Sequence, residues 1–229
     1  VWAIIPVKSL ARSKGRLAHL LPAEQREALM QTLLNHVLAV IKEAPGIVQT
    51  LVVSSDPVVR QIAEENGAIS LVEELPYDLN RAVTYAAGLA EQHGAQAVLV
   101  LPADLPFVTT ADIDLMLYAG ADVDRENDSN GTAGGLAVET EPVMAVCSDR
   151  RGSGTNALYL RPVDNFQFHY GVGSLQRHIN EALERDYRVR LVNAPGLQFD
   201  LDTEEDWQSY LAHSHSELVK SSRIKPLPN

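Results

Sequence analysis

The sequence predicts one α/β domain in which helices flank a central, mostly parallel sheet. Apolar runs of strand length alternate with amphipathic stretches through the N-terminal half of the chain. Residues 97–101 are five consecutive apolar residues, as expected for a central parallel strand that is buried on both faces. The chain has 229 residues, 45% of them hydrophobic, which suits one large domain better than two.

The elements of the N-terminal half follow from apolar periodicity and from the capping or breaking residues at their ends. Aspartate accepts hydrogen bonds from free amides at a helix start, so Asp56 is the predicted cap of the second helix and Asp78 or Asn80 that of the third. In chain order we expect a strand over residues 2–5, a helix from Pro22 to the stop at Pro45, a strand over 50–54, a helix over 58–66, a strand over 68–72, a helix that ends at Gly94, and the strand over 97–101.

The C-terminal half is less regular. Residues 120–141 mix acidic residues with turn formers and show no sustained period, which predicts a flexible acidic insertion. We assign residues 1–213 to the domain and residues 214–229 to a weakly ordered tail. The remaining predicted elements are a helix capped by Thr109 or Thr110 that reaches about 118, strands over 143–147, 157–160 and 189–192, a helix over 175–183 capped by Ser174, and a last helix capped by Asp202 or Thr203.

Composition excludes several classes of function. A net charge of −11 argues against a general nucleic-acid binder, which would need a broad basic face. The single cysteine, Cys147, rules out an internal disulfide framework, and we expect it to be a buried strand residue. No run approaches the ~18 apolar residues of a membrane span, and no signal-peptide core is recognisable. We therefore predict a cytoplasmic protein without membrane or nucleic-acid partners.

The first strand leads into a loop that is rich in cations. Lys8, Arg12, Lys14 and Arg16 all precede the first helical periodicity. Ligands of open α/β sheets bind beyond the carboxyl ends of the strands, and such a cluster matches a triphosphate better than a neutral substrate. The alternative is an ordinary solvated basic loop.

Carboxylates follow two of the expected strands or turns. Asp104 comes directly after the central strand, between prolines that restrict the backbone, and Asp200 and Asp202 precede the last helix. Magnesium uses few protein carboxylates and takes its other ligands from water and substrate phosphates, so two aspartates would suffice. The alternatives are a plain turn for Asp104 and helix capping for Asp200 or Asp202.

Two glycine-containing segments allow different readings. Gly171-Val172-Gly173-Ser174 opens a helix and could cradle a phosphate or carboxylate on free amides, or be a glycine turn with a serine cap. His178, one turn later, is more consistent with packing or support than with a general base. The letters around Gly152 and Gly154 match a dinucleotide fingerprint, but the residues that follow favour a strand rather than a helix, so we reject that reading. Phosphate-loop, nucleophile-elbow and H-E-x-x-H motifs are also missing from the sequence.

Taken together, six short motifs resemble the guanylyltransferases of deazaflavin coenzyme (factor 420) biosynthesis. The resemblance runs from about residue 2 to residue 211, in order. The motifs are Pro6-Val7-Lys8, Lys14-x-Arg16-Leu17, Asp104-Leu105-Pro106, Asp149-Arg150-x-Gly152-x-Gly154-Thr155-Asn156-Ala157-Leu158, Gly171-x-Gly173-Ser174 with Arg177-His178, and Asp200-x-Asp202-Thr203-x-x-Asp206.

The resemblance implies a Rossmann-like nucleotidyltransferase, related to the molybdenum-cofactor guanylyltransferases, that joins GTP to phosphoenolpyruvate or 2-phospho-L-lactate and releases pyrophosphate. It implies that Lys8, Lys14 and Arg16 hold the GTP phosphates. Asp104, with Asp200 or Asp202, would bind Mg²⁺, and Lys14, Arg16 and Asp104 would be catalytic. Thr155, Gly171 and Ser174 would bind the phospho acid.

Asn80 would lie at the nucleoside pocket, although Asp78 stands where the family usually has glycine. Two other functions stay open at this point: another nucleotidyltransferase of the same fold, of the molybdenum-cofactor or sugar-phosphate type, and a non-catalytic GTP-binding regulator. Residue types do not determine the acceptor acid or the oligomeric state.

Overall fold

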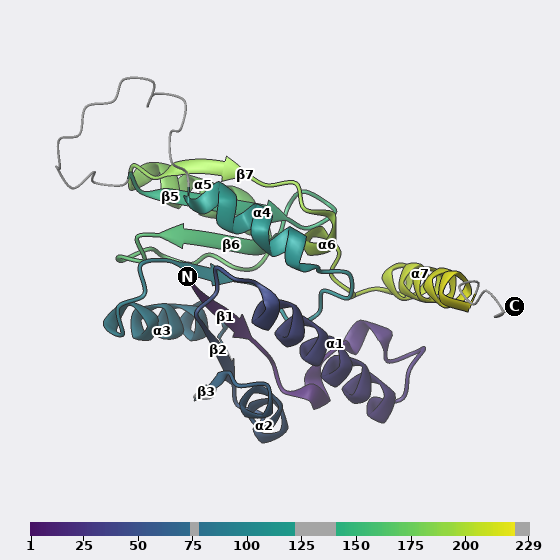
Figure 1. The fold of residues 1–229 in the computed structure, drawn as a ribbon. Helices are drawn as coiled ribbons and strands as arrows, with labels where there is room; N and C mark the ends of the chain where they lie inside the picture. The colour runs from purple at the N-terminus through teal and green to yellow at the C-terminus, as the bar shows by residue number, and fades with distance from the viewer. Residues whose placement is uncertain (74–77, 122–140, 223–229) are drawn as a thin grey trace, which may run out of the picture.

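The computed structural model describes residues 1–73, 78–121 and 141–222, and it confirms an α/β domain built on a mostly parallel sheet. In these ranges, seven strands form one sheet in the order β3-β2-β1-β4-β6-β5-β7 (Figure 1). The strands are β1 (Trp2–Pro6), β2 (Gln49–Ser54), β3 (Ile69–Val72), β4 (Val98–Val100), β5 (Val143–Ser148), β6 (Thr155–Arg161) and β7 (Arg188–Leu191).

Helices cover both faces of this sheet, and each face has its own core. On one face α1, α2, α4 and α6 pack against β-strand residues such as Ala3 and Ile5, and on the other α3 and α5 pack against residues such as Ile4. The alternation follows from the two-residue period of a strand. The helices are α1 (Ala23–Glu43), α2 (Pro57–Glu65), α3 (Leu79–Gln92), α4 (Thr110–Ala121), α5 (Ser174–Glu184), α6 (Pro195–Gln198) and α7 (Glu204–Ser222), with 3₁₀ turns at Leu10–Arg12 and Gly15–Leu17.

The direction of β6 decides which segments meet at the edge of the sheet. β1 pairs in parallel with β2 and β4, whereas β6 is antiparallel to both β4 and β5. The carboxyl ends of β1 and β4 therefore lie at the same edge as the amino end of β6. Residues that follow β1 and β4 thus come close to Thr155, the first residue of β6.

Side-chain caps begin several helices as the sequence predicts. Asp78 Oδ1 accepts hydrogen bonds from the amides of Asn80 and Arg81 at the start of α3. Thr203 and Asp206 form a reciprocal box at α7, because the Asp206 carboxylate accepts from the Thr203 amide (2.7 Å) and the Thr203 hydroxyl accepts from the Asp206 amide (3.3 Å).

Ser174 was expected to cap α5, and this prediction is wrong. Ser174 is the first helical residue rather than the residue that precedes the helix. The N-cap is Gly173, whose φ of 69° lies in the left-handed region that glycine enters without strain. The turn therefore depends on the glycine rather than on the serine hydroxyl.

Most of the predicted insertion lies outside the described residues, and so do the last residues of the predicted tail, 223–229. α4 continues to Ala121, so residues 120–121 are helical; residues 122–140 lie outside the described residues. Gly120 packs against β6 so closely that a Cβ there would lie 2.2 Å from Cε1 of Tyr159. α7 continues past residue 213 and extends away from the sheet (Figure 1). A domain boundary at residue 213 stays a prediction.

Two further predictions from the sequence concern the single cysteine and membrane-spanning segments. Cys147 lies in β5 and is fully buried, as predicted. Across the described ranges, no helix combines the length and apolar character needed to cross a membrane.

Candidate active site

A cavity of about 570 Å³ opens at the sheet edge beyond β1 and β4. Most of the residues that the sequence singled out for phosphate, metal or acceptor binding line it. These are Lys8, Lys14, Arg16, Asp104, Thr155, Asp200 and Asp202, and they are joined by Arg12, Asn156 and Tyr170. Segments separated by almost the whole chain thus share one cavity.

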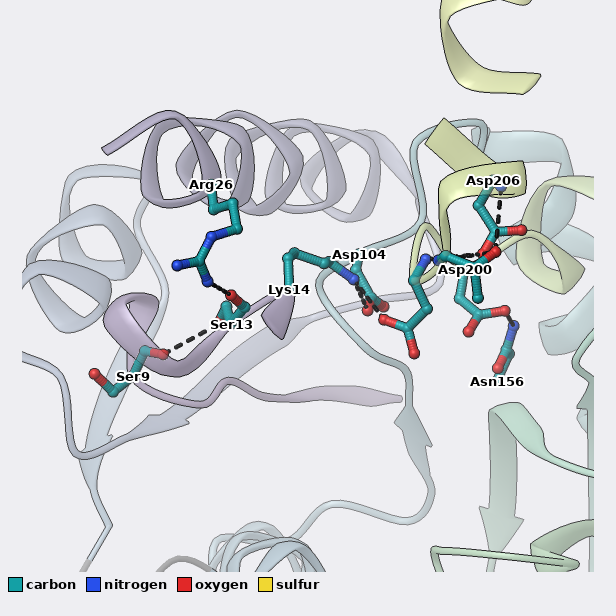
Figure 2. Close-up of polar contacts among 10 residues, drawn as sticks. Ser9, Ser13, Lys14, Arg26, Asp104, Asn156, Asp200 and Asp206 are labelled. Carbon is teal, nitrogen blue, oxygen red and sulfur yellow. Dashed lines mark hydrogen bonds and ion pairs between the residues drawn. The ribbon is translucent and has the colours of Figure 1, made fainter. Parts of the chain in front are cut away.

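The cationic loop after β1 is held in a fixed shape. The Ser13 hydroxyl donates to the Ser9 carbonyl (3.0 Å), and Arg26 of α1 donates from Nη1 to the Ser13 carbonyl (3.0 Å) (Figure 2). Lys14 itself has a left-handed backbone, with φ of 54°. A non-glycine residue rarely adopts this conformation, and the anchored loop on either side sustains it.

Lys14 joins two carboxylates that come from distant parts of the chain. Its Nζ lies 2.5 Å from Asp104 Oδ2 and 2.9 Å from Asp202 Oδ1, and only 3% of its side chain is exposed. Burial acts to lower the pKa of Lys14, but the charges of Asp104 and Asp202 outweigh it and raise the pKa above its usual value. Lys14 is therefore a buried, protonated ammonium group in the cavity wall.

The segment that carries Asp200 and Asp202 is tied directly to Asp104. The Leu201 amide donates to the Asp104 carbonyl (3.1 Å), and the Asn156 side chain donates to Asp200 Oδ1 (3.3 Å). Burial, followed by the charge of Asp104, raises the pKa of Asp200. Figure 2 shows Lys14 reaching toward Asp104, with Asp200 and Asn156 beside them. Neighbouring carboxylates that resist ionisation together are well placed to share a cation.

These carboxylates suit a hard metal ion that the substrate also ligates. Asp104 Oδ1 is buried and has no hydrogen-bond partner among the described residues. Those residues contain no group of three or more His, Cys, Asp and Glu side chains that could hold a metal alone. Magnesium-type sites commonly use one or two carboxylates and complete their octahedron with water and phosphate oxygens. The donor set therefore fits a cation bound together with a nucleotide.

A second wall of the cavity, which Thr155 and Tyr170 line, is neutral. The Thr155 hydroxyl lies 3.0 Å from Nδ1 of His178, which is completely buried, and His178 Nε2 accepts a hydrogen bond from the His169 amide (2.8 Å). Burial, with smaller contributions from His169 and Arg177, lowers the pKa of His178 to about 3. His178 is consequently neutral near pH 7, and its low proton affinity makes it a poor general base.

Three predicted site residues lie outside the cavity lining: Asn80, Gly171 and Ser174. Both polar atoms of the Asn80 side chain bond to the backbone of Tyr170, with Nδ2 donating to its carbonyl (3.2 Å) and Oδ1 accepting from its amide (2.6 Å). Tyr170 in turn lines the cavity. Asn80 therefore connects α3 to the loop that contains Gly171.

Sequence reasoning missed two supporting residues. Arg26 lies within the helical periodicity of α1, and nothing in its spacing indicates a contact with the loop after β1. Asn156 belonged to a recognised motif, but its bond to Asp200 depends on segments 44 residues apart. Only the tertiary structure reveals such contacts.

Comparison with known proteins gives a consistent assignment. A family model described as "Guanylyl transferase CofC like" matches residues 1–138 and 135–223. A phosphoenolpyruvate guanylyltransferase of Rubrobacter xylanophilus is 36% identical over 206 residues, which cover 90% of this chain and 91% of the relative. One of Sphaerobacter thermophilus is 32% identical over 93% of both chains. A 2-phospho-L-lactate guanylyltransferase of Methanothermobacter thermautotrophicus is 29% identical over 92% of this chain and 84% of the relative.

Solved structures agree on the fold. A nucleotidyl transferase from Methanothermobacter thermautotrophicus superposes with a TM-score of 0.63 at 13% identity, covering 93% of this chain and 96% of that one. The 4-diphosphocytidyl-2C-methyl-D-erythritol synthase of Anaerococcus prevotii gives 0.60 at 11% identity, covering 93% and 95%. At such low identity these similarities show the fold alone. Nucleotidyltransferases generally need a divalent metal ion, which the carboxylates of the cavity would suit.

Proposed function

Because the chain belongs to the CofC-like guanylyl transferase family, we propose that it transfers GMP from GTP to a three-carbon 2-phospho acid and releases pyrophosphate. The observation that carries this proposal is the shared cavity. One wall holds the buried Lys14 between Asp104 and Asp202, and Thr155 belongs to a second wall. Cations and a metal site are what a triphosphate needs, and a neutral hydroxyl suits a small anionic acceptor.

Phosphoenolpyruvate is the acceptor that we favour. The relatives named for this acid include those at 36% and 32% identity, whereas the relative named for 2-phospho-L-lactate is 29% identical. The two acids differ only in the C2–C3 bond, which is double in phosphoenolpyruvate and single in 2-phospho-L-lactate, so both carry the same phosphate and carboxylate groups. We keep 2-phospho-L-lactate as the second candidate.

We assign Mg²⁺ to Asp104 and to Asp200 or Asp202. The unpartnered Asp104 Oδ1 and the raised pKa of Asp200 support this assignment. When bound, the ion would neutralise charge on the triphosphate and favour departure of pyrophosphate. Lys14 already balances two of these carboxylates, so the site keeps a cation whether or not a metal is present.

The reaction does not require a side chain that removes a proton. The attacking oxygen belongs to a phosphate that is ionised near neutral pH, so the main barrier is the approach of two anions. We assign Lys8, Lys14 and Arg16 to the triphosphate, where they would stabilise the developing charge and the leaving group. Thr155 would orient the acceptor. Gly171, Ser174 and Asn80 would shape that subsite, and a cytoplasmic location stays a prediction of the sequence.

The test is pyrophosphate release by the purified protein with GTP and Mg²⁺. Phosphoenolpyruvate, 2-phospho-L-lactate and 3-phosphoglycerate serve as acceptors, and ATP and CTP serve as nucleotide controls. We expect release with GTP and a 2-phospho acid, and the faster acid identifies the acceptor. Tight GTP binding without release in any mixture would contradict the proposal and favour a GTP-binding regulator.

A further inference from the structure

We propose that His178 is a positioning residue that makes the Thr155 hydroxyl donate its hydrogen bond into the cavity. This inference rests on the proposed function, because it assigns Thr155 to the acceptor. It goes beyond it by naming a buried residue that decides in which direction the hydroxyl hydrogen points. The His178 imidazole ring makes two contacts that together determine this direction.

The tautomer of His178 is determined by its backbone neighbour. The amide of His169 donates to Nε2 at 2.8 Å, so Nε2 must present a lone pair rather than a hydrogen. A neutral imidazole has one N–H, and the hydrogen is therefore on Nδ1. The opposite tautomer would place two N–H groups against each other at this distance.

The direction of the Thr155 hydroxyl follows from that tautomer. Nδ1–H lies 3.0 Å from Thr155 Oγ1 and donates to it, so the threonine oxygen acts as acceptor toward the ring. The protonated Nδ1 cannot accept a hydrogen bond, so the Thr155 hydroxyl is left to donate its hydrogen into the cavity that Thr155 lines. Ionised phosphates and carboxylates only accept hydrogen bonds, so an anionic acceptor receives the donor that it needs.

The surroundings of His178 keep the ring neutral and still. It is fully buried, and the rings of Phe166 and Tyr170 pack against it, with centroids 6.2 and 4.8 Å away. The charged or titratable groups that face it are His169 and Arg177, which oppose a second proton, and Glu181, which favours one. Burial dominates, so the ring keeps one proton across the working pH range.

A second layer of contacts holds the His169 amide in place. Glu181 of α5 accepts from the Gln167 amide (3.2 Å) and contacts His169 Nε2 (3.2 Å), and Arg185 also donates to it. The segment that imposes the tautomer is therefore bound to the helix that carries His178. The hydroxyl direction is set before any substrate binds.

Paired variants separate the two contacts of the ring. The amide of asparagine lies near the place of Nδ1 and that of glutamine near the place of Nε2, so His178→Asn can still donate to Thr155, whereas His178→Gln keeps only the contact with His169. We expect His178→Gln to raise KM for the phospho acid about 3- to 10-fold, the effect of losing the neutral hydrogen bond that orients the Thr155 hydroxyl. We expect KM for GTP to change by less than about twofold and His178→Asn to stay near the wild type.

A double-mutant cycle tests whether His178 acts through Thr155. Thr155→Val removes the hydroxyl and keeps the shape, so in this background His178→Gln should add less than about a twofold further change in the acceptor KM. A packing role predicts the opposite: similar losses in His178→Asn and His178→Gln, persistence in the Thr155→Val background, and a change in KM for GTP. Any of these three results would overturn the proposal.

A spectroscopic measurement on the wild-type protein avoids unstable variants. Histidine ¹⁵N–¹H correlation spectra should show a protonated Nδ1 and an unprotonated Nε2 for His178, with no change between pH 6 and 8. The reverse tautomer would refute the inference even if the enzyme were fully active. If the wild type released no pyrophosphate with any acid, the proposed function would fail, and the tautomer would still be decided by this spectrum.

Discussion

The two walls of the cavity obtain their chemistry in different ways. The wall formed by the loop after β1 and by Asp104 and Asp202 is charged, and its central contact is the buried Lys14 between two carboxylates. The wall formed by Thr155 and the Tyr170 loop is neutral, and its central contact is one hydroxyl on one imidazole. The charged wall offers strong electrostatic attraction, whereas the neutral wall offers a hydrogen bond with a fixed direction.

This division has a physical reason. A charge acts over several ångströms and tolerates modest displacement of its partner, which suits a flexible triphosphate. A neutral hydrogen bond falls off steeply with angle, so it is useful only if its donor is fixed in advance. The neutral wall accordingly uses buried groups and reciprocal backbone contacts, such as those of Asn80 with Tyr170.

The largest effect is expected on the charged wall. Asp104→Asn removes a charge that balances Lys14 and a proposed metal ligand, so we expect kcat to fall about 100- to 1,000-fold with the fold intact. Lys14→Ala should cause a comparable loss. Pyrophosphate release measures the rate and circular dichroism checks the fold. Asp114→Asn, an exposed change on α4, is the control and should keep full activity. Near-normal turnover in Asp104→Asn would disprove the assignment.

Two variants, one on each wall, test whether the two walls bind different substrates. Thr155→Val should raise KM for the phospho acid about 10- to 100-fold and leave KM for GTP unchanged, because it removes one donor to an anion. Arg16→Ala should do the reverse and raise KM for GTP about fivefold, since this arginine is exposed and screened. Initial rates at varied concentrations of each substrate give both constants. Parallel shifts in both constants would mean that the walls do not serve separate substrates.

A variant of Asn80 tests whether this residue serves the acceptor or the nucleotide. Asn80→Asp places a carboxylate oxygen against the Tyr170 carbonyl and removes the Nδ2 donor. We expect KM for the phospho acid to rise about fivefold, the cost of about one hydrogen bond in a loop that lies beside Thr155. An effect confined to KM for GTP would instead assign Asn80 to the nucleoside, as the sequence resemblance predicts.

The smallest expected effect concerns stability of the neutral wall. Burial acts to raise the pKa of Glu181, but hydrogen bonds from Arg185, His169 and the Gln167 amide outweigh it and hold the pKa below its ordinary value of 4.5. The folded state then binds protons less readily than the unfolded one, so this stabilisation is present above pH 4.5 and is lost as the pH falls through the lowered pKa. Glu181→Gln should lower the free energy of unfolding by about 1–3 kcal/mol at pH 7.

Urea denaturation of the wild type and of Glu181→Gln across the acid range measures this difference. We expect the two curves to converge at low pH. Glu184→Gln, the same change at an exposed position of α5, is the control for an altered surface charge. A constant difference at all pH values would show that packing, and not the carboxylate, stabilises this segment.

Much of the architecture could be predicted from local patterns. The run at residues 97–101 indicated a buried parallel strand, and β4 pairs in parallel with β1. Asp56, Asp78 and the Thr203/Asp206 pair cap their helices as their types predict. Such predictions succeed because periodicity and capping depend on residues only a few positions apart.

Local patterns failed at one turn and at one pairing between strands that are distant in the sequence. Ser174 has the composition of a cap, yet the left-handed Gly173 takes that place. The antiparallel direction of β6 is not encoded by any short pattern, and it is this direction that brings Thr155 to the edge where β4 ends.

The sequence by itself determined the type of fold, the family, and the residue types available for phosphate and metal chemistry. Only the tertiary structure decided that Lys14 balances Asp104 and Asp202 and that His178 directs Thr155. The physical reason is range: hydrophobic periodicity and capping act along a few residues. The charge of a buried ammonium and the tautomer of a buried ring depend instead on partners that only folding brings within hydrogen-bonding distance.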